Sequence, residues 1–199
     1  MSNFLNAIKN RRSIYSLGRD ISLTELEITE LIKEAVKQSP SAFNAQEPRV
    51  ITLFGDAHEK LWELTEQALK PLTPAEAFEN TKQKLAGFKA GLGTVMFFND
   101  TDITKQLQEQ FSLYADNFPT WAEQANGIAT ANTWTALAEV GMGANLQHYN
   151  PVIDEAVTNQ WDIPTNWRLR SQLVFGSPEK QASNKDFIAD DERFKVFKQ

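Results

Sequence analysis

The chain has no cysteine and only two histidines among its 199 residues, and these absences exclude several kinds of chemistry. Disulfides, thiol nucleophiles and cysteine-ligated metals all require the missing thiol. His58 and His148 alone make a poor ligand set, so we expect no metal. The sequence also lacks a G-x-G-x-x-G fingerprint after a strand, a P-loop and a G-x-S-x-G elbow. If the protein performs redox chemistry, a bound cofactor must carry the electrons.

Excess positive charge and long apolar runs are also missing. The formal net charge is −6 and the pI is about 5.0, which argues against general binding of nucleic acid. No run approaches the roughly 18 apolar residues of a membrane span, and residues 1–9 lack the apolar core of a signal peptide. We therefore expect a cytoplasmic protein with neither nucleic-acid nor membrane partners.

What is present resembles an ordinary soluble globular protein, with 41% hydrophobic and 23% charged residues. The length fits one domain, 1–199, and no linker or repeat divides it. Several amphipathic helices alternate with a few short strands, which predicts an α+β sandwich with a small mixed sheet. Residues 94–98 are wholly apolar, so this strand should be covered on both faces. The expected strands are 49–54, 94–98 and 167–175, and the expected helices include 58–70, 75–89 and a buried Ala-rich helix ending at Val140.

Local signals predict where elements begin and which faces they bury. Ser22–Glu25 and Thr120–Glu123 have the pattern of capping boxes, and Asn150-Pro151 should open the helix that follows. In the last strand, alternation would place Trp167, Leu169, Leu173 and Phe175 on one face.

The polar tail from Gln181 to Gln199 contains five interspersed apolar residues: Phe187, Ile188, Phe194, Val196 and Phe197. These residues predict an arm that docks on another surface, such as a second subunit. A frayed terminus is the alternative.

The first stretch whose side chains could bind a ligand is Asn10-Arg11-Arg12-Ser13-Ile14-Tyr15. Its two guanidinium groups and its serine hydroxyl could hold a phosphate, because the planar guanidinium offers several donors in fixed geometry. A solvated basic patch is the simpler interpretation of this stretch alone.

The second stretch is the loop between Pro40 and Pro48. The amides of Asn44 and Gln46 each offer a donor and an acceptor, which suits the alternating edge of a planar heterocycle such as a flavin. The alternative is that these residues only form turns.

The third stretch, 138–151, has small residues that let the backbone approach a ligand closely. A glycine-terminated helix followed by a loop would explain the same pattern. His148 lies here but has no obvious carboxylate partner, and we expect it to be structural. His58 lies on a polar helical stretch and should be solvated.

Together, and in this order, the three stretches resemble the nitroreductase family of FMN-dependent NAD(P)H oxidoreductases. Gly143–Pro151 and Glu192–Phe197 resemble its compact fatty-acid-repression / copper-induced nitroreductase branch. The resemblance implies a nitroreductase-like dimeric sandwich with a C-terminal arm and FMN sites built from both chains.

The resemblance also implies roles for individual residues. Arg11, Arg12, Ser13 and Lys185 would hold the phosphate end of FMN. Ser41, Asn44 and Gln46 would reach the flavin ring from the partner, and the main chain of Leu146, Gln147 and His148 would lie beside it. No side chain is expected to be catalytic, because the chemistry belongs to the flavin.

Two positions depart from the family pattern. Tyr15 stands where many members have a basic residue near the ring, and a phenol stabilises a reduced flavin less well. Phe187 stands where many members have a second basic residue for the phosphate. Arg12, Arg193 or another lysine could compensate.

The implied function is reduction of nitroaromatics or quinones by two-electron, ping-pong hydride transfer from NADH or NADPH, with stress defence as one expected role. Five aromatic residues could line the acceptor pocket or simply form core: Phe43, Phe111, Tyr114, Phe118 and Trp121. The rival functions are a flavin-binding sensor with little turnover and a cofactor-free interaction protein.

Overall fold

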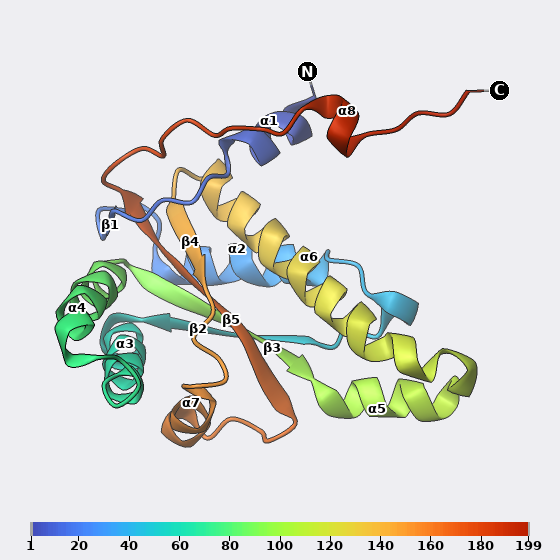
Figure 1. Cartoon of the computed structure of the whole chain (residues 1–199), viewed down its shortest axis with the longest axis horizontal. Coiled ribbons are helices and arrows are strands. Elements are labelled where there is room, and N and C mark those ends of the chain that lie inside the picture. Colours follow the sequence, from blue (N-terminus) through green and yellow to red (C-terminus); the bar gives the residue numbers. More distant parts are fainter. Residues whose placement is uncertain (1, 199) are drawn as a thin grey trace.

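The computed structural model describes residues 2–198 and is built around a five-stranded sheet (Figure 1). The strands run in the order β1-β5-β3-β2, and β4 also pairs with β5. Their bounds are Leu17–Gly18 for β1, Pro48–Phe54 for β2, Gly93–Asp100 for β3, Gly143–Gln147 for β4 and Trp167–Pro178 for β5. The α+β fold class is confirmed. The sheet expected to be mixed is antiparallel in every ladder between described strands, and its parallel element is an isolated bridge between Ser13 and Ala144.

Helices cover both faces of this sheet (Figure 1). The α-helical bounds are Asn3–Asn10 for α1, Glu25–Lys37 for α2, Gly55–Leu69 for α3, Ala75–Lys89 for α4, Thr101–Gln110 for α5, Phe118–Glu139 for α6, Asp154–Trp161 for α7 and Asp190–Arg193 for α8. Two 3-10 segments, η1 at Ala42–Asn44 and η2 at Ser112–Asn117, complete the elements. None of the helices in residues 2–198 is both long and apolar enough to cross a membrane.

Strand β3 separates the two halves of the core, and all eight of its residues are buried. Val95 and Phe97 face the cluster formed with α2 and α6, whereas Met96 and Phe98 face the cluster formed with α3, α4 and α7. Because successive side chains point to opposite faces, one apolar strand serves both halves. The expectation of a strand covered on both sides is confirmed.

A β-bulge in β5 overturns the expected face of that strand. Phe97 pairs with Ser171 while Phe98 pairs with Leu169, so Arg170 is the extra residue. The alternation shifts at this point, since two residues of β5 oppose one of β3. Trp167 and Leu169 consequently pack on the α3 side, whereas Leu173 and Phe175 pack on the α2 side.

Several expected helix starts are displaced. The capping box of α2 is formed by Thr24 and Glu27, each side chain bonding to the other's backbone, and not by the Ser22–Glu25 pattern. Helix α6 begins at Phe118 with a proline in its first turn, so Thr120–Glu123 is no capping box. Helix α7 begins at Asp154, beyond the cis peptide bond of Asn150-Pro151.

His58 was expected to be solvated, and this expectation is wrong. The ring is fully buried at the start of α3, with Nδ1 2.9 Å from the Thr94 hydroxyl and Nε2 3.3 Å from the Lys89 carbonyl. Burial lowers its pKa from 6.5 to about 4, so the imidazole is neutral at pH 7.

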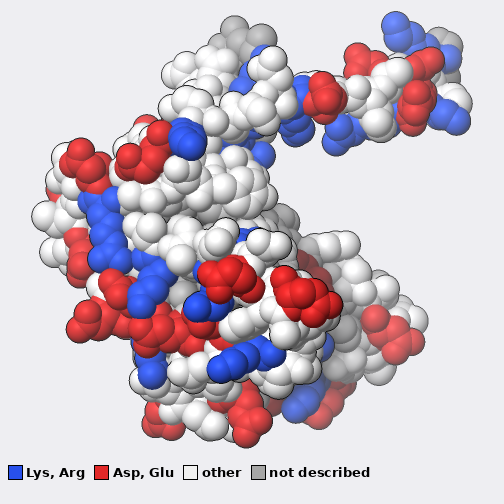
Figure 2. All heavy atoms as spheres, turned by 60° about the vertical axis from the view of Figure 1, so that its left-hand side comes forward, with Lys and Arg blue, Asp and Glu red and all other residues white. Residues whose placement is uncertain are grey.

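The C-terminal residues form an extended arm, and its docking on a second subunit stays a prediction. After β5 the chain passes beside the loop that follows α1 and extends beyond the body of the molecule (Figure 1), with side chains of both charges along it (Figure 2). Its apolar residues are exposed, from 59% for Ile188 to 91% for Phe197. The arm contributes no residue to the buried part of either core cluster.

Candidate functional site

The first and third stretches singled out in the sequence lie side by side. Ile14 donates its main-chain N–H to the Ala144 carbonyl at 2.9 Å, and the Asn145 side chain donates to the Ile14 carbonyl at 2.8 Å. A side chain at Gly143 would collide with that of Ile14, so glycine permits this close approach. The N-terminal basic loop is therefore fixed against β4.

The beginning of the arm lies on the other side of the same loop. The short β1 pairs with the end of β5, and the Glu179 N–H donates to the Ser16 carbonyl at 2.9 Å. The Arg12 guanidinium donates to the Ser183 carbonyl at 2.6 Å. Two segments far apart in the sequence thus face each other.

Between them lies a cleft of about 480 Å³, which we call the basic cleft. Its wall consists of Arg11, Arg12, Ser13, Ile14, Tyr15, Ser16, Lys180, Gln181, Ala182, Ser183 and Lys185. The wall carries four cationic side chains, several hydroxyls and no carboxylate, a donor set that suits a phosphate monoester. Five predicted site residues meet here: Arg11, Arg12, Ser13, Tyr15 and Lys185.

A second cavity, which we call the inner cavity, has a volume of about 430 Å³ and shares Arg11 with the basic cleft. Leu146 and His148 of the third stretch contribute to its wall. The Arg11 guanidinium carbon lies 4.4 Å from the centroid of the Trp134 ring, a cation–π stack. Burial, and then the charge of Arg12, lowers the pKa of Arg11. Arg11 therefore stands at the junction of the two spaces.

Polar groups in the wall of the inner cavity have no protein partner. The Thr130 and Ser171 hydroxyls and the Trp134 indole N–H are buried and form no hydrogen bond with any residue between 2 and 198. Since buried polar groups are normally satisfied, such orphans indicate a missing partner. Arg170, turned toward this cavity by the bulge, is held by Glu123 through an ion pair of 2.8 Å. The wall thus combines polar and apolar groups and suits a partly polar ligand.

Gln147 takes a different direction from its two neighbours. Its side chain is buried and donates to Asn145 Oδ1 at 2.8 Å, whereas Leu146 and His148 line the inner cavity. This follows from strand alternation. Only the main chain of Gln147 is left to serve the role implied for it.

The second stretch does not join either space within one chain. Ser41 and Phe43 contact the first half of α6 near Trp121, in a separate apolar groove of about 340 Å³. The groove and the inner cavity use different residues of the same part of α6: Gln124, Ala125 and Ile128 line the groove, whereas Asn126, Gly127 and Thr130 line the cavity. Ser41, Asn44 and Gln46 therefore line neither the basic cleft nor the inner cavity of their own chain.

The loop itself has an unusual backbone. Phe43, Asn44 and Gln46 all have positive φ, between 53° and 55°, which is uncommon for residues other than glycine. Ser41 Oγ accepts the Gln46 N–H at 2.8 Å, and the Arg49 guanidinium donates to the Gln46 carbonyl at 2.6 Å. Strain of this kind is retained where the surroundings enforce it, often at functional sites.

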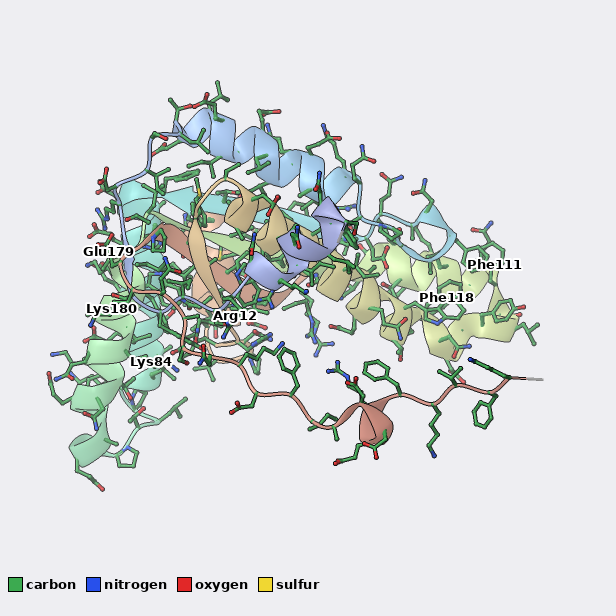
Figure 3. All side chains as sticks on the ribbon, turned by 90° about the horizontal axis from the view of Figure 1, so that it is seen from above. Arg12, Lys84, Phe111, Phe118, Glu179 and Lys180 are labelled. Atoms are coloured by element: carbon green, nitrogen blue, oxygen red, sulfur yellow. The ribbon has the colours of Figure 1, made fainter. Side chains whose placement is uncertain are left out.

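The five aromatic residues named from the sequence form one cluster. Phe43 lies 4.7 Å from Phe111 and 5.7 Å from Phe118 between ring centroids, and Trp121 lies 5.1 Å from Phe118. Phe111 and Phe118 are visible together at the α5–α6 corner in Figure 3. Phe43 remains 55% exposed, so the cluster presents an aromatic face beside the strained loop.

Several residues of the site were not singled out from the sequence, and three of them are important besides Thr130 and Ser171. Lys180 lines the basic cleft, while Trp134 and Arg170 line the inner cavity. Trp134 could have been found from its place on the same helix as the third stretch. Arg170 could not, because only the bulge turns it inward. Within residues 2–198, no group of three or more His, Asp or Glu side chains is arranged to hold a metal.

Comparison with known proteins places this geometry in a family. The Nitroreductase family profile matches residues 8–177. The nitroreductase FRM2 of Saccharomyces cerevisiae is 36% identical over 190 residues, covering 94% of this chain and 93% of the relative. The structure of nitroreductase CinD from Lactococcus lactis, determined with chloramphenicol, is 54% identical and superimposes with a TM-score of 0.92 over 98% of this chain and 100% of that one.

A more distant structure, from Desulfovibrio desulfuricans and in complex with FMN, shares the fold with a TM-score of 0.71 at 18% identity, covering 98% of each chain. The chain belongs to the nitroreductase family. It is accordingly an oxidoreductase of the nitroreductase type.

Proposed function

We propose that this protein is an FMN-dependent NAD(P)H oxidoreductase that reduces small, electron-poor aromatic compounds, nitroaromatics or quinones, in the cytoplasm. The observation that carries the proposal is the junction at Arg11 of a carboxylate-free basic cleft with a partly polar inner cavity. A phosphate monoester joined to a planar heterocycle matches this pair of spaces. Bound FMN would supply the two-electron chemistry, receiving a hydride from NADH or NADPH and passing it to the acceptor.

The residues of the chain would then bind, orient and shield. Arg12, Ser13 and Lys185 hold the anionic end in the basic cleft. Arg11, rigid on the Trp134 ring, places a positive charge between the two spaces. The orphaned hydroxyls of Thr130 and Ser171 and the indole of Trp134 stand in the wall of the inner cavity. Since no side chain needs to form a bond, the absence of a catalytic triad is accounted for.

We further propose that the working form is a homodimer. Within one chain, Ser41, Asn44 and Gln46 line neither the basic cleft nor the inner cavity, so a second copy would supply them. Exposed apolar side chains of α1, Phe4 at 68% and Ile8 at 44%, and those of the arm would be covered in such a dimer. Contiguous exposed apolar surface commonly marks an interface.

The choice of acceptor follows from the relatives and from the aromatic cluster. CinD has been crystallised with chloramphenicol and with 4-nitrophenol, both nitroaromatic compounds. In this chain Phe43 exposes its ring beside the loop that would face the partner's cavity. An exposed aromatic face favours flat acceptors, because offset stacking of rings is stabilising.

The test is steady-state oxidation of NADH and NADPH by the purified protein with 4-nitrophenol or a benzoquinone as acceptor. We expect oxidation that depends on the acceptor, with parallel-line kinetics of a ping-pong cycle. A bound flavin that stays oxidised in excess NADH and NADPH would contradict the proposed turnover and favour the sensor.

A further inference from the structure

The arm supplies fewer cations to the basic cleft than the family resemblance implies. Phe187 replaces the second basic residue, and its ring is 74% exposed with the Lys185 ammonium 5.0 Å from its centroid. Arg193 is no substitute, because it lies in α8 beside Phe194 and does not line the cleft. A phosphate dianion in the cleft would therefore lack one expected partner.

Two of the remaining cations already have other contacts. The Arg12 guanidinium donates one of its N–H groups to the Ser183 carbonyl, and the Arg11 guanidinium lies on the Trp134 ring. Lys180 differs from both. Its ammonium makes no hydrogen bond or ion pair with any residue between 2 and 198, although it lines the same cleft.

The backbone at Lys180 is held in place by its neighbour. The Glu179 N–H donates to the Ser16 carbonyl at 2.9 Å, and the Glu179 carboxylate accepts from the Ser177 hydroxyl at 2.7 Å. That carboxylate lies directly beside Gly18, where a side chain would collide with it. Figure 3 shows Glu179 and Lys180 in succession where the arm leaves the body, beside the loop that carries Arg12. Glu179 is not part of the wall of the cleft.

We propose that Lys180 is a phosphate-binding residue and that it takes the place of the cation lost at Phe187. The ligand class is a phosphate monoester, and the assignment rests on the proposed function, in which FMN is that monoester. A lysine on a fixed backbone loses less freedom on binding than one on the extended arm, since only its side chain must be ordered.

The test compares FMN with riboflavin, which has the same ring and no phosphate. Dissociation constants for both are measured by fluorescence quenching on wild type, Lys180→Gln, Lys180→Arg and Lys195→Gln. Lys195 is a matched control, because it lies on the arm outside the cleft. We expect Lys180→Gln to weaken FMN binding about tenfold, in line with one charge-assisted hydrogen bond, and to leave riboflavin binding within about twofold. Lys180→Arg should retain most of the affinity for FMN.

Three results would overturn the assignment. FMN affinity unchanged in Lys180→Gln would remove Lys180 from the phosphate site. Equal losses for FMN and riboflavin would assign it a structural role instead. An equal loss of FMN affinity in Lys195→Gln would show that the effect comes from the net charge of the protein and not from a contact in the cleft. If the wild-type protein bound neither flavin, the proposed function itself would fail, a result distinct from these three.

Discussion

At the scale of single residues, His58 shows how burial sets a chemical property. The imidazole is enclosed by α3, α4 and β3; besides burial, the charge of Arg19 lowers its pKa and the charge of Glu59 raises it. Its neutral form is held between the Thr94 hydroxyl and the Lys89 carbonyl, so protonation would place a charge in the core. The consequence is a stability that depends on pH.

The sign follows from the lowered pKa, about 4 when folded against 6.5 when unfolded. Between pH 6.5 and about pH 4, His58 binds a proton in the unfolded chain but not in the folded chain. The free energy of unfolding therefore falls as the pH is lowered through this range. The contribution of this group is about 3 kcal/mol over that window. We expect the difference in unfolding free energy between wild type and His58→Gln to shrink by this amount from pH 7 to pH 4 in urea titrations.

His148→Gln is the matched control, since this histidine is exposed and lines the inner cavity. It should keep the full wild-type loss of stability on acidification. Carboxylates titrate in every variant and cancel in the comparison. A difference between wild type and His58→Gln that stays constant from pH 7 to pH 4 would contradict the account.

The site residues were predictable from the sequence only as separate short stretches. The Arg11–Ser13 motif, the 41–46 loop and the 146–148 segment are each readable because their side-chain types suit a phosphate or a heterocycle. Their distances depend on tertiary packing, which no local pattern records. His58 was misassigned for a related reason, because the polar residues around it on α3 say nothing about the side that faces β3.

At the scale of elements, residue patterns predicted β2, β3 and β5, and α4 was predicted with its observed bounds. The short strands β1 and β4 were not predicted, and the segment that forms β4 had been interpreted as a loop after a glycine-terminated helix. Element starts were less predictable, because a capping pattern of Ser, Thr and Glu can occur two residues away from the real cap. The bulge at Arg170 could not be predicted from the alternation of residues within β5, because it depends on how β5 pairs with β3. That irregularity reverses the faces of Leu169 and Leu173 and places Arg170 in the inner cavity.

Mutation can distinguish the observed N-cap of α2, Thr24, from the N-cap expected from the sequence, Ser22. Thr24 Oγ1 accepts the Glu27 N–H at 3.2 Å, and the Glu27 carboxylate accepts the Thr24 N–H at 2.8 Å. We expect Thr24→Ala to lower the free energy of unfolding by about 1 kcal/mol, the usual effect of removing an N-cap. Ser22→Ala should change it by less than about 0.5 kcal/mol, because Ser22 lies outside the cap. A larger loss of unfolding free energy for Ser22→Ala than for Thr24→Ala in urea titrations would contradict the observed cap and favour the one expected from the sequence.

At the scale of the whole molecule, the arm and α1 present apolar side chains that one chain leaves uncovered. Truncation after Asp186 removes all five apolar residues of the arm and keeps Lys185. Because none of the removed residues belongs to the buried core, we expect unchanged far-ultraviolet circular dichroism but a shift from dimer to monomer in sedimentation velocity. A truncated protein that remains dimeric would show that the arm does not hold the two copies together.

The most direct measurement is the visible spectrum of the purified protein, followed by release and quantification of any flavin. The account predicts an absorbance band near about 450 nm and one FMN per chain, retained by two copies at two sites. A colourless preparation that also fails to bind added FMN would contradict it, since the basic cleft and the inner cavity would then lack the ligand inferred from their chemistry.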